Sequence, residues 1–122
     1  MSGERPDHAP KETPVTLEAL REANIRRAAE WHGESKAPSI EYRFMELAGE
    51  VGEACNAQKK LSRTDMGVRG GTEGLEHLTE ELADVLICLD LVAMDLGIDL
   101  GEAVRMKFNK TSEKYGLGAR LS

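Results

Sequence analysis

Apolar residues recur along most of the chain at helical spacing, and breaks in this pattern divide it into four segments. Thr16, Ser39 and Asp99 each precede a segment, where a side-chain oxygen can cap the start of a helix. Glycines at 33, 97 and 116 follow the first, third and fourth segments, as is typical after a helix end. We therefore expect helices at 17–32, at 40 to about 61, at 75–96 and at 100–115.

The third segment, LEHLTEELADVLICLDLVAMDL, is apolar on almost every side from Leu82 onward, which predicts a central position among the helices. At about 1.5 Å per residue it would span roughly 33 Å. That is more apolar length than the neighbours in one small chain can cover. The first segment has only a modest apolar stripe and should pack on the outside. The expected fold is all-α: a four-helix bundle completed by oligomerisation.

Residues 1–15 contain three of the four prolines and little that can be buried. We expect them to form a disordered or loosely attached arm. Residues 16–122 are expected to form a single helical domain, since 122 residues suffice for one core but not two. The connector at 62–74 contains four glycines and has a length that often carries a ligand contact.

Composition narrows the classes of protein and the compartment. Hydrophobic residues make up 40% and aromatic residues only 4%, so the core is aliphatic. The net charge of -6 argues against binding a nucleic-acid polymer, which requires a basic face. No apolar signal region follows Met1, and aspartates interrupt the long apolar run, so neither a secretory signal nor a membrane span is expected. Cys55 and Cys88 are expected to be buried free thiols. Because free thiols are typical of a reducing compartment, we expect a cytoplasmic location.

Acidic residues occur in two groups beside the most apolar segments. Glu46, Glu50 and Glu53 are spaced by four and three residues, so they share one stripe of the second helix. Glu81 and Asp84 lie one turn apart on the third helix, with Asp84 flanked by apolar residues. Burying an isolated carboxylate costs several kcal/mol unless a cation takes up its charge. Two helices that each present two carboxylates can enclose a hard divalent cation.

Ligand chemistry favours particular metals. A set of carboxylates without histidine or thiolate indicates Mg²⁺, with Mn²⁺ as a substitute, over zinc. A di-iron site would require Glu-x-x-His, and none of His8, His32 and His77 has a glutamate three residues before it. A carboxylate-held Mg²⁺ can neutralise phosphate oxygens and assist attack by water. The alternative is a non-catalytic helical interaction module, whose acidic stripe pairs with a basic partner.

The stretches LAGEVGEA (47–54) and EELADVLI (80–87), followed by GIDL (97–100) and KFNKTSEKYG (107–116), resemble the MazG-like nucleoside triphosphate pyrophosphohydrolases. The resemblance covers roughly 40–115. It implies an all-α, MazG-like bundle assembled as a homodimer or homotetramer. The implied reaction is Mg²⁺-dependent hydrolysis of a nucleoside triphosphate, ribo or deoxy, to the monophosphate and pyrophosphate.

The same resemblance implies roles for individual residues. Matched position by position, Glu50, Glu53, Glu81 and Asp84 would be the metal ligands. Glu46 lies one turn earlier on the same stripe and has no fixed role in the family's motif. We assign it to catalysis together with Glu50 and Glu53 and expect it to position the attacking water or a second ion. Many relatives carry K-x-x-x-N-x-x-R-Y in the last helix, whereas this chain has Thr111 in place of the asparagine. The candidate substrate contacts are Trp31, Lys59, Arg63, Lys107, Asn109, Lys110 and Lys114.

Overall fold

The computed structural model describes residues 13–67 and 74–122, and these form four α-helices. They are α1 (Leu17–His32), α2 (Ile40–Asp65), α3 (Leu75–Asp95) and α4 (Leu100–Lys114). The described part of the chain contains no strand, which confirms the all-α class. Most of the predicted arm at 1–15 lies outside the described residues.

The predicted caps start three of the four helices. The hydroxyl oxygens of Thr16 and Ser39 accept hydrogen bonds from the backbone N–H groups of Ala19 and Tyr42, and Asp99 accepts one from Glu102. Each contact satisfies a backbone donor that has no partner within its helix. Helix α2 extends four residues beyond the predicted end at Leu61, because its backbone bonding continues to Met66.

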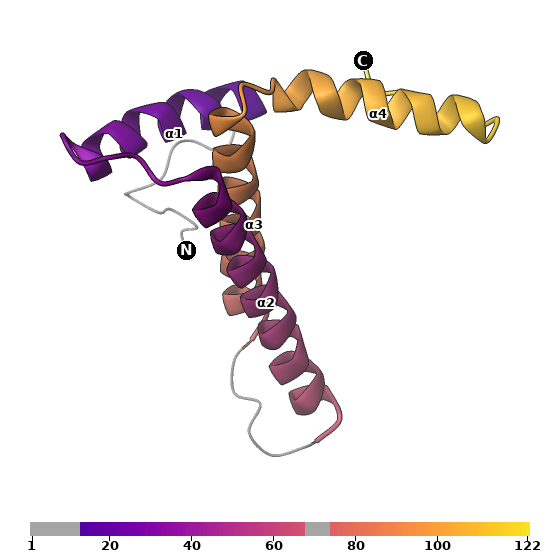
Figure 1. Ribbon diagram of the computed structural model, residues 1–122. Coiled ribbons are helices and arrows are strands. Elements are labelled where there is room, and N and C mark those ends of the chain that lie inside the picture. Colours follow the sequence, from indigo (N-terminus) through magenta and orange to yellow (C-terminus); the bar gives the residue numbers. More distant parts are fainter. Residues whose placement is uncertain (1–12, 68–73) are drawn as a thin grey trace.

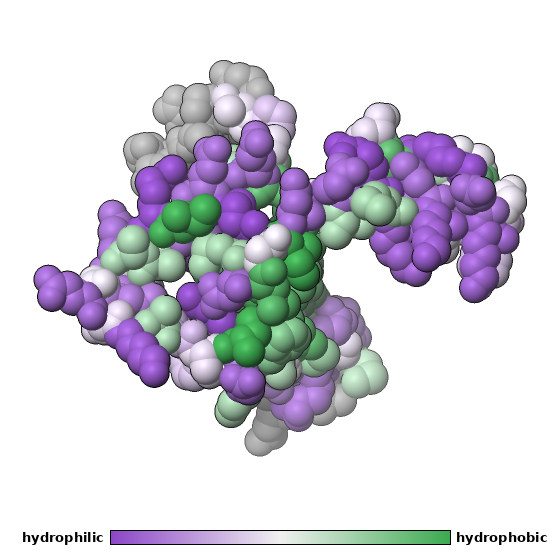
Figure 2. All heavy atoms as spheres, turned by 45° about the horizontal axis from the view of Figure 1, so that its top comes forward, coloured by the Kyte–Doolittle hydropathy of each residue, from purple (hydrophilic) through white to green (hydrophobic). Residues whose placement is uncertain are grey.

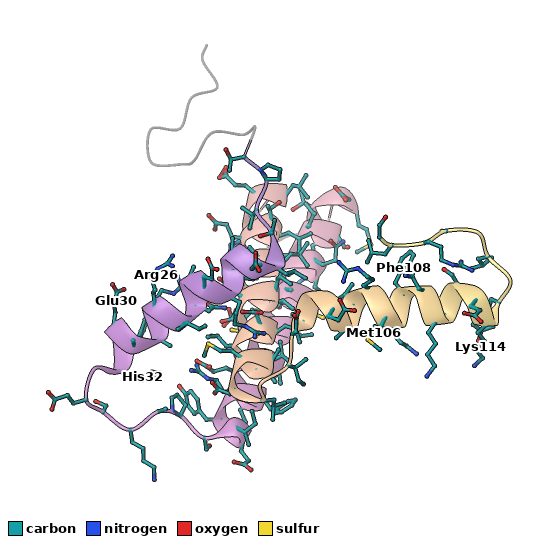
Figure 3. The ribbon with its side chains drawn as sticks, turned by 90° about the horizontal axis from the view of Figure 1, so that it is seen from above. Arg26, Glu30, His32, Met106, Phe108 and Lys114 are labelled. Atoms are coloured by element: carbon teal, nitrogen blue, oxygen red, sulfur yellow. The ribbon has the colours of Figure 1, made fainter. Side chains whose placement is uncertain are left out.

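Helices α2 and α3 lie side by side and run antiparallel, with the most extensive contact in the chain (Figure 1). Helix α1 crosses the end of this pair where α3 finishes, and α4 projects away from the same end (Figure 1). Seen from above, α1 and α4 extend to opposite sides of the pair, with Lys114 at the far end of α4 (Figure 3). The four helices therefore do not close into one bundle within a single chain.

The buried residues of α2 include small apolar ones. Ala54 and Ala57 are buried, whereas the larger Phe44 and Val51 are about half exposed. Small alanines allow the two helix backbones to approach closely, which places the stripe containing Glu50 at the helix contact. The larger side chains of α2 therefore lie beside this contact and stay exposed to solvent in a single chain.

Large hydrophobic side chains remain exposed along α2, α3 and α4. A hydrophobic strip lies on the upright part of the molecule, where α2 and α3 are found (Figure 2). Contiguous apolar surface of this kind is unusual on a monomer and marks an interaction surface. The exposed residues on these three helices include Phe44, Val51, Leu82, Leu86, Leu89, Val104, Met106 and Phe108. No helix in the described part of the chain has the length and apolar character needed to span a membrane.

The buried carboxylate in α3 is Asp90, not the predicted Asp84. Asp90 is 0% exposed, whereas Asp84 lies on the surface. Arg21 donates from Nε and Nη2 to the two carboxylate oxygens of Asp90, at 3.2 and 3.1 Å, and Asn24 donates to the same group at 3.0 Å. Arg21 also donates to the carbonyl of Ile98 at 2.8 Å. This network fixes α1 on α3 through polar contacts.

Both cysteines are free thiols, as predicted, but only one of them is shielded from solvent. Cys55 is exposed, which contradicts the predicted burial, because α2 turns its alanine face to α3. Cys88 is partly buried, and burial is the main reason that its pKa is raised.

Replacing Arg21 by glutamine should destabilise the fold by about 3 kcal/mol, because the Asp90 charge would then be buried with only Asn24 beside it. Urea unfolding followed by circular dichroism measures the loss. Arg26→Gln, at an exposed position of the same helix, is the control and should change the free energy of unfolding by less than about 0.5 kcal/mol. Equal effects of the two variants would contradict a structural role for the network.

Candidate metal centre

Three glutamates meet where α2 and α3 pack against each other. One carboxylate oxygen from each of Glu50, Glu53 and Glu81 lies within 4.8 Å of the other two. Glu50 and Glu53 are one turn apart on α2, so both side chains reach the same side, and Glu81 enters from α3. We call these three residues the glutamate cluster. The predicted convergence of acids from two helices is thus present in the structure.

Two oxygens of the glutamate cluster are buried without a hydrogen-bond partner. They are Oε2 of Glu50 and Oε2 of Glu81, and the Glu81 side chain is only 12% exposed. Leaving a buried charged acceptor unsatisfied is costly. Among the described residues no lysine or arginine forms an ion pair with any of the three glutamates. A cation coordinated by these oxygens would remove the cost.

Burial and mutual repulsion both act on the ionisation of the cluster. The pKa of Glu50 is raised above its ordinary value, first by burial and then by the negative charges of Glu53, Asp84, Glu81 and Glu46. Burial likewise raises the pKa of Glu81, with Glu53 adding to the shift. His77, whose Nε2 lies 3.5 Å from Glu81 Oε1, acts in the opposite direction. Both carboxyl groups are therefore harder to ionise than an ordinary glutamate.

The residues fit a hard divalent cation. Carboxylate oxygens from flexible glutamates are the ligands that Mg²⁺ and Mn²⁺ prefer in proteins. No cysteine or histidine among the described residues belongs to the cluster, although His77 Nε2 lies 3.5 Å from Glu81 Oε1. The donor set therefore does not resemble a zinc site.

Asp84 and Glu46 lie beside the glutamate cluster but are not part of it. Asp84 is exposed, one turn after Glu81, and its charge still acts on Glu50. Glu46 accepts a hydrogen bond of 3.4 Å from Nη1 of Arg43. Both residues line a pocket of about 340 Å³ that also includes Glu50.

This pocket has an acidic side and an aromatic side. Trp31, at the end of α1, and Tyr42, in the first turn of α2, line it together with Pro38. Trp31 is 78% exposed, so its ring is not part of a core. An apolar, partly open wall next to carboxylates suits a ligand with a flat ring and a charged group.

A larger hollow of about 640 Å³ lies between α1 and α4, away from the glutamate cluster. Its two arginines already have acidic partners: Arg21 binds Asp90 and Arg105 binds Glu102. With both arginines paired, the residues that line this hollow offer no free positive charge for an anionic ligand.

The predicted substrate contacts are dispersed in the structure. Trp31 lines the pocket, whereas Lys59 is exposed and Arg63 partly buried in the last two turns of α2. Lys107, Lys110 and Lys114 are exposed on α4, which projects away from the α2–α3 pair (Figure 1). The Asn109 side chain donates to the carbonyl of Leu121 at 2.9 Å and accepts from its N–H at 2.7 Å.

Sequence reasoning did not identify Arg43 as a residue of the site. Arg43 is buried at 6% exposure, lines the pocket, and donates from Nε to Asp95 Oδ2 at 2.9 Å. Burial lowers the pKa of Arg43, but the hydrogen bonds and charges of Asp95 and Glu46 outweigh it, and the net shift is upward. The available signal was spacing: Arg43 precedes Glu46 by three residues and Glu50 by seven, on one helix face.

Comparison with protein-family profiles matches residues 39–115 to the MazG nucleotide pyrophosphohydrolase domain. No curated protein and no solved structure gave a significant match. The matched region covers more than half of the chain and contains α2, the glutamate cluster, α3 and α4. Members of this family are metal-dependent hydrolases that act on the phosphoanhydride bonds of nucleoside triphosphates. With an all-α fold and an acidic cluster between its two central helices, this chain belongs to the MazG nucleotide pyrophosphohydrolase family.

Proposed function

We propose that this chain is a Mg²⁺-dependent pyrophosphohydrolase that converts a nucleoside triphosphate, ribo or deoxy, and water to the monophosphate and pyrophosphate. The observation that carries the proposal is the glutamate cluster, in which two buried carboxylate oxygens have no partner. Family membership supports the reaction class.

Glu50, Glu53 and Glu81 would hold the cation, and Asp84 would join them by rotation of its exposed side chain. Asp84 is close enough for its charge to raise the pKa of Glu50. A bound Mg²⁺ supplies positive charge that offsets the phosphate oxygens and assists the attack of water. Mn²⁺, with similar ligand preferences, should substitute.

The remaining pocket residues orient the reactants. Glu46 faces the pocket and would position the attacking water. Water forms a bond to the α-phosphorus, and the bond from that phosphorus to the bridging oxygen breaks, so pyrophosphate leaves with the electron pair. Trp31 offers an exposed ring on which a nucleobase can stack. Lys59 and Arg63 would contact phosphate oxygens.

We further propose that the active form is a homodimer or homotetramer. The exposed hydrophobic residues of α2, α3 and α4 provide the surface that a second copy would cover. In such an assembly the candidate contacts Lys107, Asn109, Lys110 and Lys114 could approach the cluster of a neighbouring chain, which α4 does not approach within its own chain. The sites would then act on nucleotides in the cytoplasm, without nucleic-acid polymer or membrane as partners.

Mg²⁺ should raise the melting temperature, because a cation that binds only the folded state stabilises it by about 2.7 kcal/mol at one hundred times its dissociation constant. Thermal melting is measured with MgCl₂ and with NaCl at matched ionic strength. Glu50→Gln and Glu81→Gln should abolish the Mg²⁺-specific rise. Glu80→Gln, an exposed neighbour on α3, is the charge-matched control and should retain it. Indifference of the wild type to Mg²⁺ would favour the interaction module.

Glu53→Gln and Asp84→Asn should each lower turnover more than about 100-fold, because each removes a candidate ligand of the cation. A panel of ribo- and deoxynucleoside triphosphates with pyrophosphate detection measures the loss. The melting temperature without Mg²⁺ should stay the same or rise, since one repulsive charge is removed. Full Mg²⁺-dependent activity in both variants would exclude these residues from the mechanism.

Without metal, stability should fall as pH rises above 4.5, through the raised pKa values of Glu50 and Glu81. In that window the folded chain holds more protons than the unfolded chain, so raising the pH favours unfolding. Mg²⁺ stabilisation should increase across the same window, because the ligands must be ionised. Melting in chelator and in Mg²⁺ over a pH series measures both trends. Both trends should become flat in the double variant Glu50→Gln/Glu81→Gln. An unchanged pH profile in this variant would contradict the assignment of the pH dependence to Glu50 and Glu81.

A further inference from the structure

A buried cation begins the stripe of α2 that carries the acids. Arg43 is 6% exposed and is followed at spacings of three, four and three by Glu46, Glu50 and Glu53. Because these spacings follow the helical repeat, all four side chains leave α2 on the same side. A guanidinium therefore lies on the same side of α2 as Glu50 and Glu53 and lines the same pocket as Glu50, although no sequence motif named it.

Arg43 is fixed from two directions. Its Nε donates to Oδ2 of Asp95 at 2.9 Å, and Asp95 is the last residue of α3. Its Nη1 donates to Oε1 of Glu46 at 3.4 Å. Since the guanidinium is planar, two anchored nitrogens determine the orientation of the whole group. Asp95 thus sets the position of the cation that contacts Glu46.

The choice of partners points to a role beyond neutralisation. A cation present only to relieve repulsion would be most effective inside the glutamate cluster, where three carboxylate oxygens crowd together. Arg43 instead pairs with Glu46 and Asp95, and no arginine or lysine in the described ranges forms an ion pair with the cluster. Glu46 is thus the acid of this stripe that has an arginine partner, and it lines the same pocket as Glu50.

We propose that Arg43 is a positioning residue that, held by Asp95, directs the Glu46 carboxylate into the pocket, where Glu46 accepts the proton of the attacking water. The inference rests on the proposed function. In this step one O–H bond of water breaks and its proton moves to a Glu46 oxygen. The water oxygen forms the bond to the α-phosphorus as pyrophosphate leaves.

Arg43→Gln should lower kcat by about 10- to 100-fold, because a residue that orients a reacting group typically contributes that much. KM and the Mg²⁺-induced rise in melting temperature should stay close to wild type, since the cluster is untouched. Arg43→Lys should fall in kcat as well, because one ammonium keeps the charge but cannot span both carboxylates in the same geometry. Arg26→Gln, which removes an equal charge from an exposed position, is the control and should keep wild-type kinetics.

A double-mutant cycle tests whether Arg43 acts through Glu46. Glu46→Gln alone should lower kcat, and adding Arg43→Gln to it should cause no further loss. If Arg43→Gln does not fold, Asp95→Asn replaces it in the cycle, because it releases Arg43 without removing the charge of the guanidinium. Asp95→Asn should also lower kcat, and again only when Glu46 is present.

The outcomes separate this inference from the proposed function. Two results would overturn the inference alone, provided that the wild type hydrolyses nucleotides. In the first, Arg43→Gln keeps the wild-type kcat. In the second, Arg43→Gln lowers kcat by the same factor in the wild type and in Glu46→Gln. The inference would also be overturned if Arg43→Gln reduced the Mg²⁺-induced rise in melting temperature in parallel with kcat, since Arg43 would then act on the cluster. A wild type without turnover on the whole nucleotide panel overturns the proposed function and the inference with it.

Discussion

Repulsion among carboxylates at the contact between α2 and α3 is the constraint on which the rest of the site depends. The two helices pack through alanines, so they come close enough to bring Glu50, Glu53 and Glu81 together. Burial opposes ionisation of Glu50 and Glu81, and the neighbouring negative charges add to the effect. The fold keeps a locally unfavourable arrangement that a divalent cation would convert into a stabilising one.

Two aspartates of α3 differ from the glutamate cluster because each has an arginine partner. Asp90 is held by Arg21 and Asn24, and Asp95 is held by Arg43. These aspartates, near the end of α3 that meets α1 and the start of α2, fasten neighbouring helices by charged hydrogen bonds. One chain therefore uses carboxylates in two ways. Asp90 and Asp95, each paired with an arginine, support the fold, whereas the three glutamates of the cluster have no arginine or lysine partner among the described residues.

The shape of the chain places its functional parts at different distances from the cluster. Trp31 reaches the pocket because α1 crosses the end of the α2–α3 pair. Helix α4 leaves that end in the other direction, with its lysines and with Val104 and Phe108 exposed (Figure 3). Helix α4 therefore presents exposed apolar residues and exposed lysines that lie away from the α2–α3 pair of its own chain. This is the surface that the proposed second copy would cover.

The sequence by itself determined the helices and the spacing of the acids. Capping oxygens at Thr16, Ser39 and Asp99 and the helical repeat of Glu46, Glu50 and Glu53 are local properties, and local hydrogen bonding decides them. Only the tertiary structure decided which carboxylates are buried and which cation meets them. Helix α3 is apolar nearly all round, so its periodicity does not define which side faces α1 or α2, and Asp84 and Asp90 were equivalent in that respect. Rotation of α3 against α1 and α2 buried Asp90 and brought Asp95 to Arg43, because contacts between residues more than 50 positions apart fix the rotation.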